Sequence, residues 1–336
     1  MKKLGQRMPT FLAGEFQASA SALQEAFPAK LDRLVVLTDG SLQPAFISPD
    51  VAARLRDSTS AVRRAVEYAF PPDKPMRAGL AINGYPMEES CNVDLIALKE
   101  DIPGMCSDGY IKEMLATFVF DHELGHLVVR NGMSYDEHLN ECAADAYAAL
   151  RHIQRFGKDT GFFESHSRAP HVVLGGSLPH YTDAALREVK ALSARKDMTK
   201  LSLQETAKRA ADIADRCSLG EATLGKLARA YLPVADACKR HIGDRPEVAK
   251  RLRHKNDEMW PLMFRETVRV MREYQGDSDI FQAGKSFLSH PDRRKYMEDL
   301  ARTDPEWKAA LDFIDMPEKE GNPAGRPSPQ GAKAAL

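Results

Sequence analysis

Short apolar runs and turn signals alternate through the N-terminal third of the chain, whereas later apolar residues recur at helical spacing. Three runs predict strands: Leu31–Thr38, Ala78–Ile82 and Val93–Leu98. Asn83-Gly84, directly after the second run, is a strong hairpin-turn signal. Between the first two runs, residues 48–70 repeat their apolar positions with the period of a helix.

Two helices are predicted in the middle of the chain, over residues 107–130 and 134–155. Asn131-Gly132 ends the first, and Ser134-x-x-Glu137 has the spacing of a capping box at the start of the second. A turn this short makes two helices antiparallel neighbours. Small side chains on the second helix allow a close approach; these are Ala143, Ala144, Ala146 and Ala148.

The first of these helices carries a pattern of two histidines within the apolar run Phe118–Val129. His122 and His126 are four residues apart, so their Cβ atoms lie on one face, about 5–6 Å from each other. Two imidazoles so placed can bind one Zn²⁺, whose bonds to nitrogen are about 2.0–2.1 Å long. Glu123 leans toward the same face, where a general base must stand to take a proton from water. The competing interpretation, two solvated histidines on an amphipathic helix, conflicts with the surrounding apolar residues.

The second helix offers three candidates for a third metal ligand. Glu141 and Asp145 are four residues apart and share a face, and His138 lies one turn before Glu141. The antiparallel arrangement of the two helices brings Glu141 back toward His122 and His126. We favour Glu141 because it also has an acidic residue one turn further on.

These two segments resemble the gluzincin metallopeptidases, the thermolysin-like branch of the zincins. The gluzincin signature is His-Glu-x-x-His followed by Asn-Glu-x-x-x-Asp, and the second part is matched by Asn140, Glu141 and Asp145. The chain does not resemble a metzincin, since Gly132 stands where that pattern needs its third histidine. The resemblance covers only about residues 107–156.

The resemblance implies a role for each matched residue. His122, His126 and Glu141 would be zinc ligands, and Glu123 the catalytic base. Asp145 would orient a ligand histidine through the outer ring nitrogen, the usual arrangement behind a metal-bound imidazole.

We therefore expect an α+β fold, in which a zincin-like domain over residues 31–182 has a small mixed sheet and the His-Glu-x-x-His helix. A mainly helical domain would follow over residues 183–315, preceded by an N-terminal arm over residues 1–30. Residues 316–336, rich in Pro, Gly and Ala, predict a disordered tail.

Cys91–Lys99 is the candidate for an edge strand that pairs with extended substrate, with an interior strand of the same sheet as the alternative. Within the helical domain, helices are predicted over Ala184–Ala194, Leu203–Arg216, Gly220–Cys238, Pro246–Tyr274 and parts of Ile280–Ala310.

Peptide hydrolysis also requires a hydrogen-bond donor for the oxyanion of the tetrahedral intermediate. Residues 157–182 directly follow the helix of the third ligand, so we expect this segment to border the cleft. Its best candidates for the donor are His171, His180 and Tyr181, with ordinary loop residues as the alternative interpretation.

Composition limits the partners of the chain. A net charge of −1 over 336 residues argues against bulk nucleic-acid binding. No run approaches the roughly 18 apolar residues of a membrane span. The five cysteines are scattered, without a Cys-x-x-Cys pair, and no apolar signal segment stands near the N-terminus, so we expect a cytoplasmic protein.

We predict a zinc-dependent metallopeptidase that hydrolyses a peptide or protein substrate with a zinc-activated water and Glu123 as the general base. The alternatives are a regulatory zinc protein whose helical domain recognises a partner, and a structural zinc site without turnover. An open position on the metal is typical of catalysis, whereas a fourth protein ligand is typical of a structural site. The sequence predicts neither the cleavage specificity nor the oligomeric state.

Overall fold

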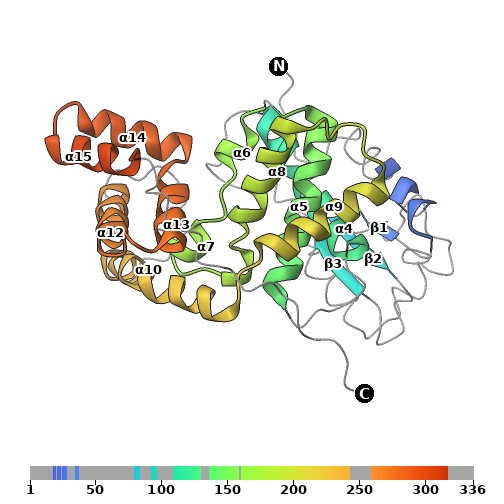
Figure 1. Ribbon diagram of the computed structural model, residues 1–336, viewed down its shortest axis with the longest axis horizontal. Coiled ribbons are helices and arrows are strands. Elements are labelled where there is room, and N and C mark those ends of the chain that lie inside the picture. The colour runs from blue at the N-terminus through green and yellow to red at the C-terminus, as the bar shows by residue number, and fades with distance from the viewer. Residues whose placement is uncertain are drawn as a thin grey trace, which may run out of the picture.

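The computed structural model describes part of the chain: residues 18–28 except 20 and 24, 35–37, 79–83, 92–96, 109–129, 136–158, 160–242 and 259–316. The described residues are mostly helical and form two lobes, each around its own hydrophobic core (Figure 1). The predicted helix over residues 48–70, the turns next to the strands and the tail from residue 317 onward lie outside the described residues. Within the described residues, no helix combines the length and apolar character that crossing a membrane requires.

The first lobe contains a small antiparallel sheet with the strand order β1-β2-β3. Its strands are β1 (Val35–Leu37), β2 (Gly79–Asn83) and β3 (Asn92–Ile96), which overlap the three predicted strands. In the part of the sheet that the structure describes, β3 is an edge strand, since only β2 pairs with it. β3 also lies next to the helix that carries His122 and His126.

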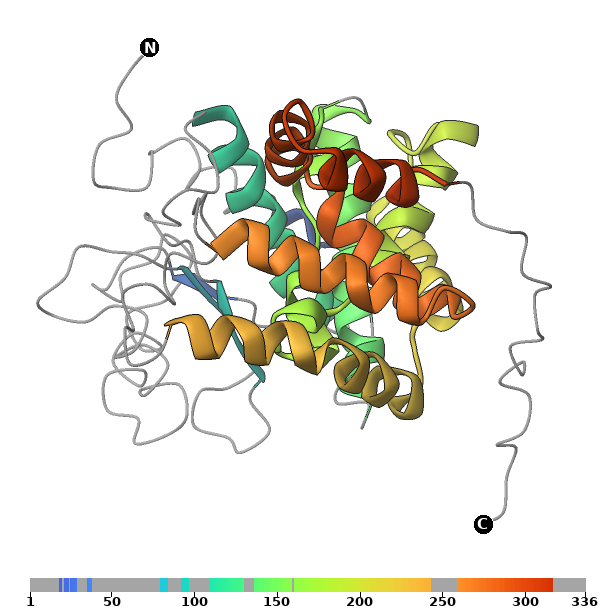
Figure 2. The same cartoon turned by 90° about the vertical axis from the view of Figure 1, so that its left-hand side faces the viewer.

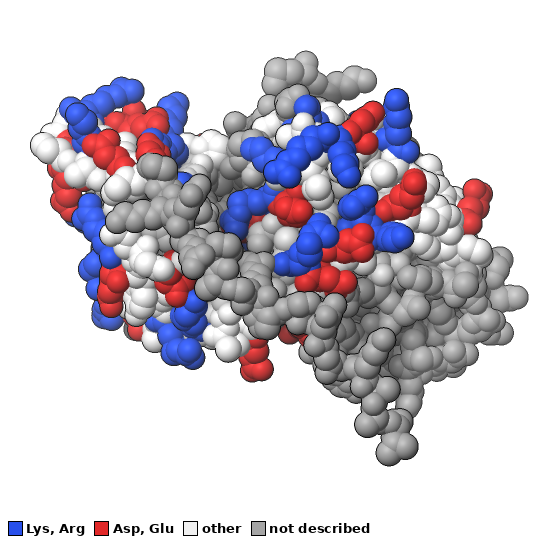
Figure 3. All heavy atoms as spheres, viewed as in Figure 1, with Lys and Arg blue, Asp and Glu red and all other residues white. Residues whose placement is uncertain are grey.

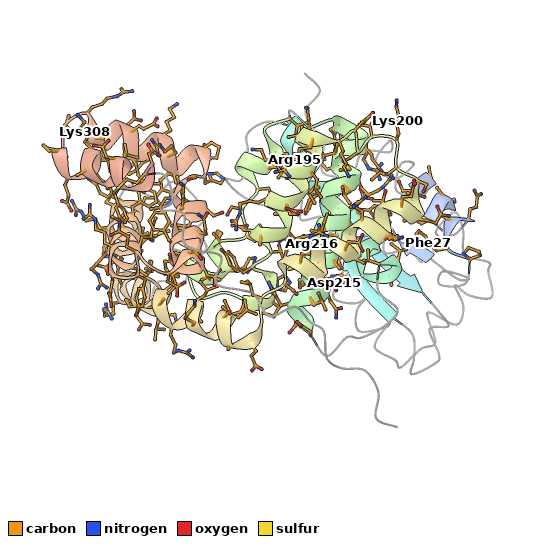
Figure 4. All side chains as sticks on the ribbon, viewed as in Figure 1. Phe27, Arg195, Lys200, Asp215, Arg216 and Lys308 are labelled. Carbon is orange, nitrogen blue, oxygen red and sulfur yellow. The ribbon has the colours of Figure 1, made fainter. Side chains whose placement is uncertain are left out.

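The helices of the first lobe pack around one central helix, α5, which contacts α4, α8 and α9. Their bounds are α4 (Gly109–Val128), α5 (Glu137–Phe156), α6 (Phe162–Ser165), α8 (Asp183–Arg195) and α9 (Leu203–Cys217). Polar contacts join these helices at the surface as well: Arg216 of α9, labelled in Figure 4, forms a 3.1 Å ion pair with Glu188 of α8.

The prediction of an α+β fold with a small mixed sheet is wrong. The described residues are mostly helical, and their three short strands pair only in antiparallel fashion. The physical reason lies in α5, whose residues 141–150 are all buried. A helix buried on every side sits at the centre of a core, so helices rather than a sheet form the middle layer of this lobe.

Helices α4 and α5 meet at Gly125, and this contact sets the geometry of the candidate site. A Cβ atom at position 125 would lie 2.9 Å from the Cα of Ala144, a separation that real Cβ atoms essentially never show. Helix α5 begins about two turns before Ala144, where the carboxylate of Asp136 accepts a hydrogen bond from the backbone N–H of Leu139. The predicted capping box from Ser134 is therefore wrong, because Asp136 directly precedes the helix and its carboxylate caps the first turn.

The helices of the second lobe face the viewer in Figure 2. They pack around a core rich in aromatic and methionine side chains. Its elements are α7 (Pro170–Val173), α10 (Glu221–Ile242), α12 (Met259–Glu273), α13 (Ser278–Leu288), α14 (Pro291–Ala301) and α15 (Pro305–Ile314). The hydroxyl of Tyr231 in α10 donates to the carbonyl of Ile280 in α13 over 2.6 Å. This bond satisfies a buried phenol that has no access to water.

The domain boundaries stay a prediction, but the two cores group the chain differently from a division at residues 182 and 183. Helices α8 and α9, up to Cys217, contribute to the first core, together with Leu23 near the N-terminus. The α7 segment and Tyr181 contribute to the second core. The segment between α6 and α8 therefore crosses to the second lobe and returns to the first. Its path positions part of the candidate site.

Candidate metal centre

Three side chains from α4 and α5 converge at the interface between these helices. The Nε2 atoms of His122 and His126 lie 3.2 Å apart. The carboxylate of Glu141 lies 3.3 Å from His122 Nε2 through Oε2, and 3.6 Å from His126 Nε2 through Oε1. Within the described residues, this is the group whose donor atoms could hold a metal ion.

These separations fit a tetrahedral ion. Ligand atoms about 2.0–2.1 Å from a tetrahedral Zn²⁺ lie about 3.3–3.4 Å from one another, which is close to the 3.2 Å between the two histidine nitrogens and the 3.3 Å from Glu141 Oε2 to His122 Nε2. In addition, Glu141 Oε2 is buried, and its neighbours in the structure are the ring nitrogens of His122 and His180, at 3.3 and 3.6 Å. Burying a carboxylate is costly, and a bound cation would offset this cost.

The pKa values of the three side chains also favour a bound cation in this cluster. Burial opposes a charge on His122, but the Asp145 and Glu141 carboxylates outweigh it and raise the pKa of His122 to about 10. Burial, followed by the charge on His122, lowers the pKa of His126 to about 4. Despite its burial, Glu141 has a pKa lowered to about 2 by the neighbouring histidines. The cluster thus holds one proton between two imidazoles, and a divalent cation would replace that proton, because an imidazole ligand is neutral.

Asp145 lies behind the cluster and contacts the outer face of His122. Its Oδ1 is 2.6 Å from His122 Nδ1, the nitrogen that points away from the cluster. Asp145 also accepts hydrogen bonds from the Arg168 guanidinium and from the Thr182 hydroxyl. Burial opposes ionisation, but Arg168 and His122 hold the pKa of Asp145 well below its usual value. Asp145 therefore fixes the tautomer and the orientation of the His122 ring.

His138, the alternative third ligand, is turned toward other partners. Its Nδ1 lies 2.8 Å from the carbonyl oxygen of Pro179, and its Nε2 lies 3.5 Å from Cys142 Sγ. Both ring nitrogens are thus engaged outside the cluster. The structure brings Glu141, rather than His138 or Asp145, to the Nε2 atoms of both histidines.

The segment after α5 contributes one further imidazole. His180 ends the short 3-10 helix η1 (Leu178–His180), and its Nε2 lies 3.6 Å from Glu141 Oε2. The ring of His171 stacks on that of His180 at 5.3 Å between centroids. Tyr181 is instead buried in the second core, so of the three predicted donors His180 is the one that lies against the cluster.

Glu123 occupies the remaining predicted position. Its side chain is partly exposed, next to His122 on α4, and its charge contributes to the raised pKa of His122. A partly exposed carboxylate close enough to act on the charge of His122 can exchange a proton with water, as a general base must.

Both signs of charge occur on the surface of the described residues. On the face shown in Figure 3, Lys and Arg are interspersed with Asp and Glu over the two lobes.

Comparison with known proteins adds no relative: no family model, no curated protein and no solved structure matches the chain.

Proposed function

We propose that the chain is a zinc-dependent metallopeptidase. The observation that carries this proposal is the convergence of His122, His126 and Glu141 at the spacing of a tetrahedral ion. Two nitrogen donors and one carboxylate are a common donor set of catalytic zinc, which leaves a fourth position for water or substrate. When bound, zinc supplies a Lewis acid that polarises a carbonyl and lowers the pKa of water to about 7.

The side chains around the cluster suit peptide hydrolysis. Glu123 accepts a proton from the attacking water and passes it to the leaving amine, as a general base and then a general acid. His180 donates a hydrogen bond to the oxyanion that develops on the substrate carbonyl. Strand β3, an edge strand beside α4 in the described sheet, offers main-chain groups to an extended peptide. A reducing, cytoplasmic setting suits the free thiols of the described cysteines, which are Cys142, Cys217 and Cys238.

Metal analysis combined with an unbiased peptide-library digest tests this function. We expect about one zinc ion per purified chain, as a single three-ligand site requires. We expect cleavage of library peptides to stop when a chelator removes the metal and to return when zinc is restored. Zinc binding without any cleavage across the library would contradict the peptidase function.

A structural zinc site is the second candidate, and the position of His180 is the observation that favours it. Its Nε2 is 3.6 Å from Glu141 Oε2, so a small shift of the His180 ring would bring it to the three converging ligands. However, His180 is not part of the group whose donor atoms all lie within 4.8 Å of one another. The distance of His180 from this group favours a role as a hydrogen-bond donor over a role as a fourth ligand.

Replacement of His180 distinguishes the two candidates. If His180 is a donor to the oxyanion, His180→Ala should lower kcat about 10²–10³-fold, as the loss of an oxyanion donor does, with zinc content unchanged. If His180 closes a structural site, the same variant should instead lose zinc. Tyr181→Phe is the matched control: it removes one hydroxyl from the neighbouring residue in the second core and should cleave like wild type.

A further inference from the structure

The carboxylate of Asp145 accepts hydrogen bonds from two residues of the segment between α6 and α8. Arg168 donates two hydrogen bonds to it, from Nε to Oδ2 over 2.9 Å and from Nη2 to Oδ1 over 2.8 Å. The hydroxyl of Thr182 donates to Oδ2 as well. Asp145 is completely buried, at 0% exposure, so these bonds and the contact with His122 fix its orientation without help from solvent.

Arg168 is itself held by Asp183 at the start of α8, which also contacts the second lobe. Its backbone N–H donates to Asp183 Oδ1 over 2.6 Å. The other oxygen of Asp183 accepts hydrogen bonds from Ser167 and from Ser286, which lies on α13 in the second lobe. A continuous set of polar contacts therefore runs from α13 through Asp183 and Arg168 to Asp145 and the metal centre.

We propose that Arg168 is a positioning residue of the metal centre, which fixes the Asp145 carboxylate and is placed in turn by the second lobe through Asp183 and Ser286. This inference rests on the proposed function of the cluster as a zinc site. It assigns the second lobe a role in the affinity of the centre for its metal, in addition to any role in substrate recognition.

The physical reason for an arginine at this position is its geometry. A planar guanidinium forms two parallel bonds with a carboxylate and prevents its rotation, whereas a lysine ammonium makes a single, freely rotating contact. Rotation of Asp145 would release Nδ1 of His122 and let its ring turn. Since the ring carries one of the three donor atoms, metal affinity should fall even when the helices stay folded.

The test is zinc affinity, measured by competition with a chromophoric chelator, in the full-length Arg168→Lys variant. We expect affinity to fall about 10–100-fold, the range for lost partners of metal-bound histidines. We also expect a changed visible absorption spectrum of the cobalt-substituted protein, which reports the ligand geometry directly. The matched control is Arg155→Lys, because Arg155 makes an equivalent two-bond contact with the buried Asp121, at 3.1 Å for each bond, in the same lobe.

The link to the second lobe is tested separately with Ser286→Ala, which removes a single hydroxyl and leaves the lobe's core intact. We expect a several-fold loss of zinc affinity, non-additive with Arg168→Lys, as neighbours in one polar network show. Ser278→Ala, an exposed position on the same helix, should bind zinc like wild type. If Arg168→Lys does not fold, Ser286→Ala still tests the proposal, because unchanged zinc affinity in that variant would overturn it.

Two results separate this inference from the proposed function. Unchanged zinc affinity and cobalt spectrum in Arg168→Lys, or losses no greater than in Arg155→Lys, would overturn the positioning role and leave the peptidase function intact. Conversely, a wild-type protein that binds zinc but cleaves no peptide would overturn the peptidase function, while the expected loss of affinity in Arg168→Lys would still support the positioning role.

Discussion

The Glu123→Gln variant is expected to bind zinc like the wild-type protein and to cleave peptides about 10²–10⁴-fold more slowly, the usual cost of removing a general base. The substitution keeps the size and hydrogen-bonding reach of the side chain and removes only its basicity. Glu123 is not one of the three converging residues, so the metal should stay in place. The measurement is kcat on a peptide identified in the library digest, with zinc content determined on the same preparation.

Glu137→Gln serves as the control for this comparison, because it makes the same chemical change at an exposed position in the first turn of α5. It should leave both kcat and zinc content unchanged. Equal turnover by Glu123→Gln and wild type would exclude Glu123 as the base. A variant that lost zinc together with activity would show instead that Glu123 supports the metal.

The local parts of the candidate site could be predicted from sequence because they depend on spacing within a helix. The i, i+4 relation of His122 and His126 on α4, and of Glu141 and Asp145 on α5, is fixed by helix geometry once each helix forms. The antiparallel arrangement of two helices joined by a short turn then brings the pairs together. The predicted convergence of His122, His126 and Glu141 is what the structure shows.

Contacts between distant segments were not predictable in the same way. A buried carboxylate such as Asp145 requires a cationic partner, but the sequence contains 47 lysines and arginines and nothing in its spacing selects Arg168. Likewise, Tyr181 and His180 are adjacent in sequence and were equivalent candidates for the oxyanion donor. Only the path of the chain, which turns Tyr181 into the second core, separates them.

The fold class was misjudged for a related reason. The runs that predict β1, β2 and β3 were recognisable, since strands of a few residues between turn signals have a clear local pattern. Local pattern does not reveal which layer covers a core, and nothing in the spacing of α8 and α9 indicates that they pack against α5. Their apolar faces match the α5 surface only in three dimensions, and periodicity alone does not name the partner of a face.

Glu141→Ala is expected to lose most of its bound zinc, and this is the largest effect on metal binding that we predict. The carboxylate supplies the third of three converging ligands, and its loss leaves two imidazoles, fewer protein ligands than a zinc site requires. His138→Ala should keep its zinc, because both nitrogens of His138 are engaged with Pro179 and Cys142 outside the cluster. Zinc content by elemental analysis, after dialysis against metal-free buffer, provides the measurement.

Asp145→Ala completes the series and should fall between the other two variants, since it removes the support of His122 but no ligand. Its expected loss of zinc affinity is about 10–100-fold, less than for Glu141→Ala, with folding followed by thermal unfolding of the metal-free proteins. Loss of Asp145 also leaves the half-buried Arg168 charge without its carboxylate partner, so part of its effect should appear as lower thermal stability. If Glu141→Ala and wild type held equal zinc, the third ligand would have to be sought elsewhere, and His180, 3.6 Å from Glu141, would be the next residue to replace.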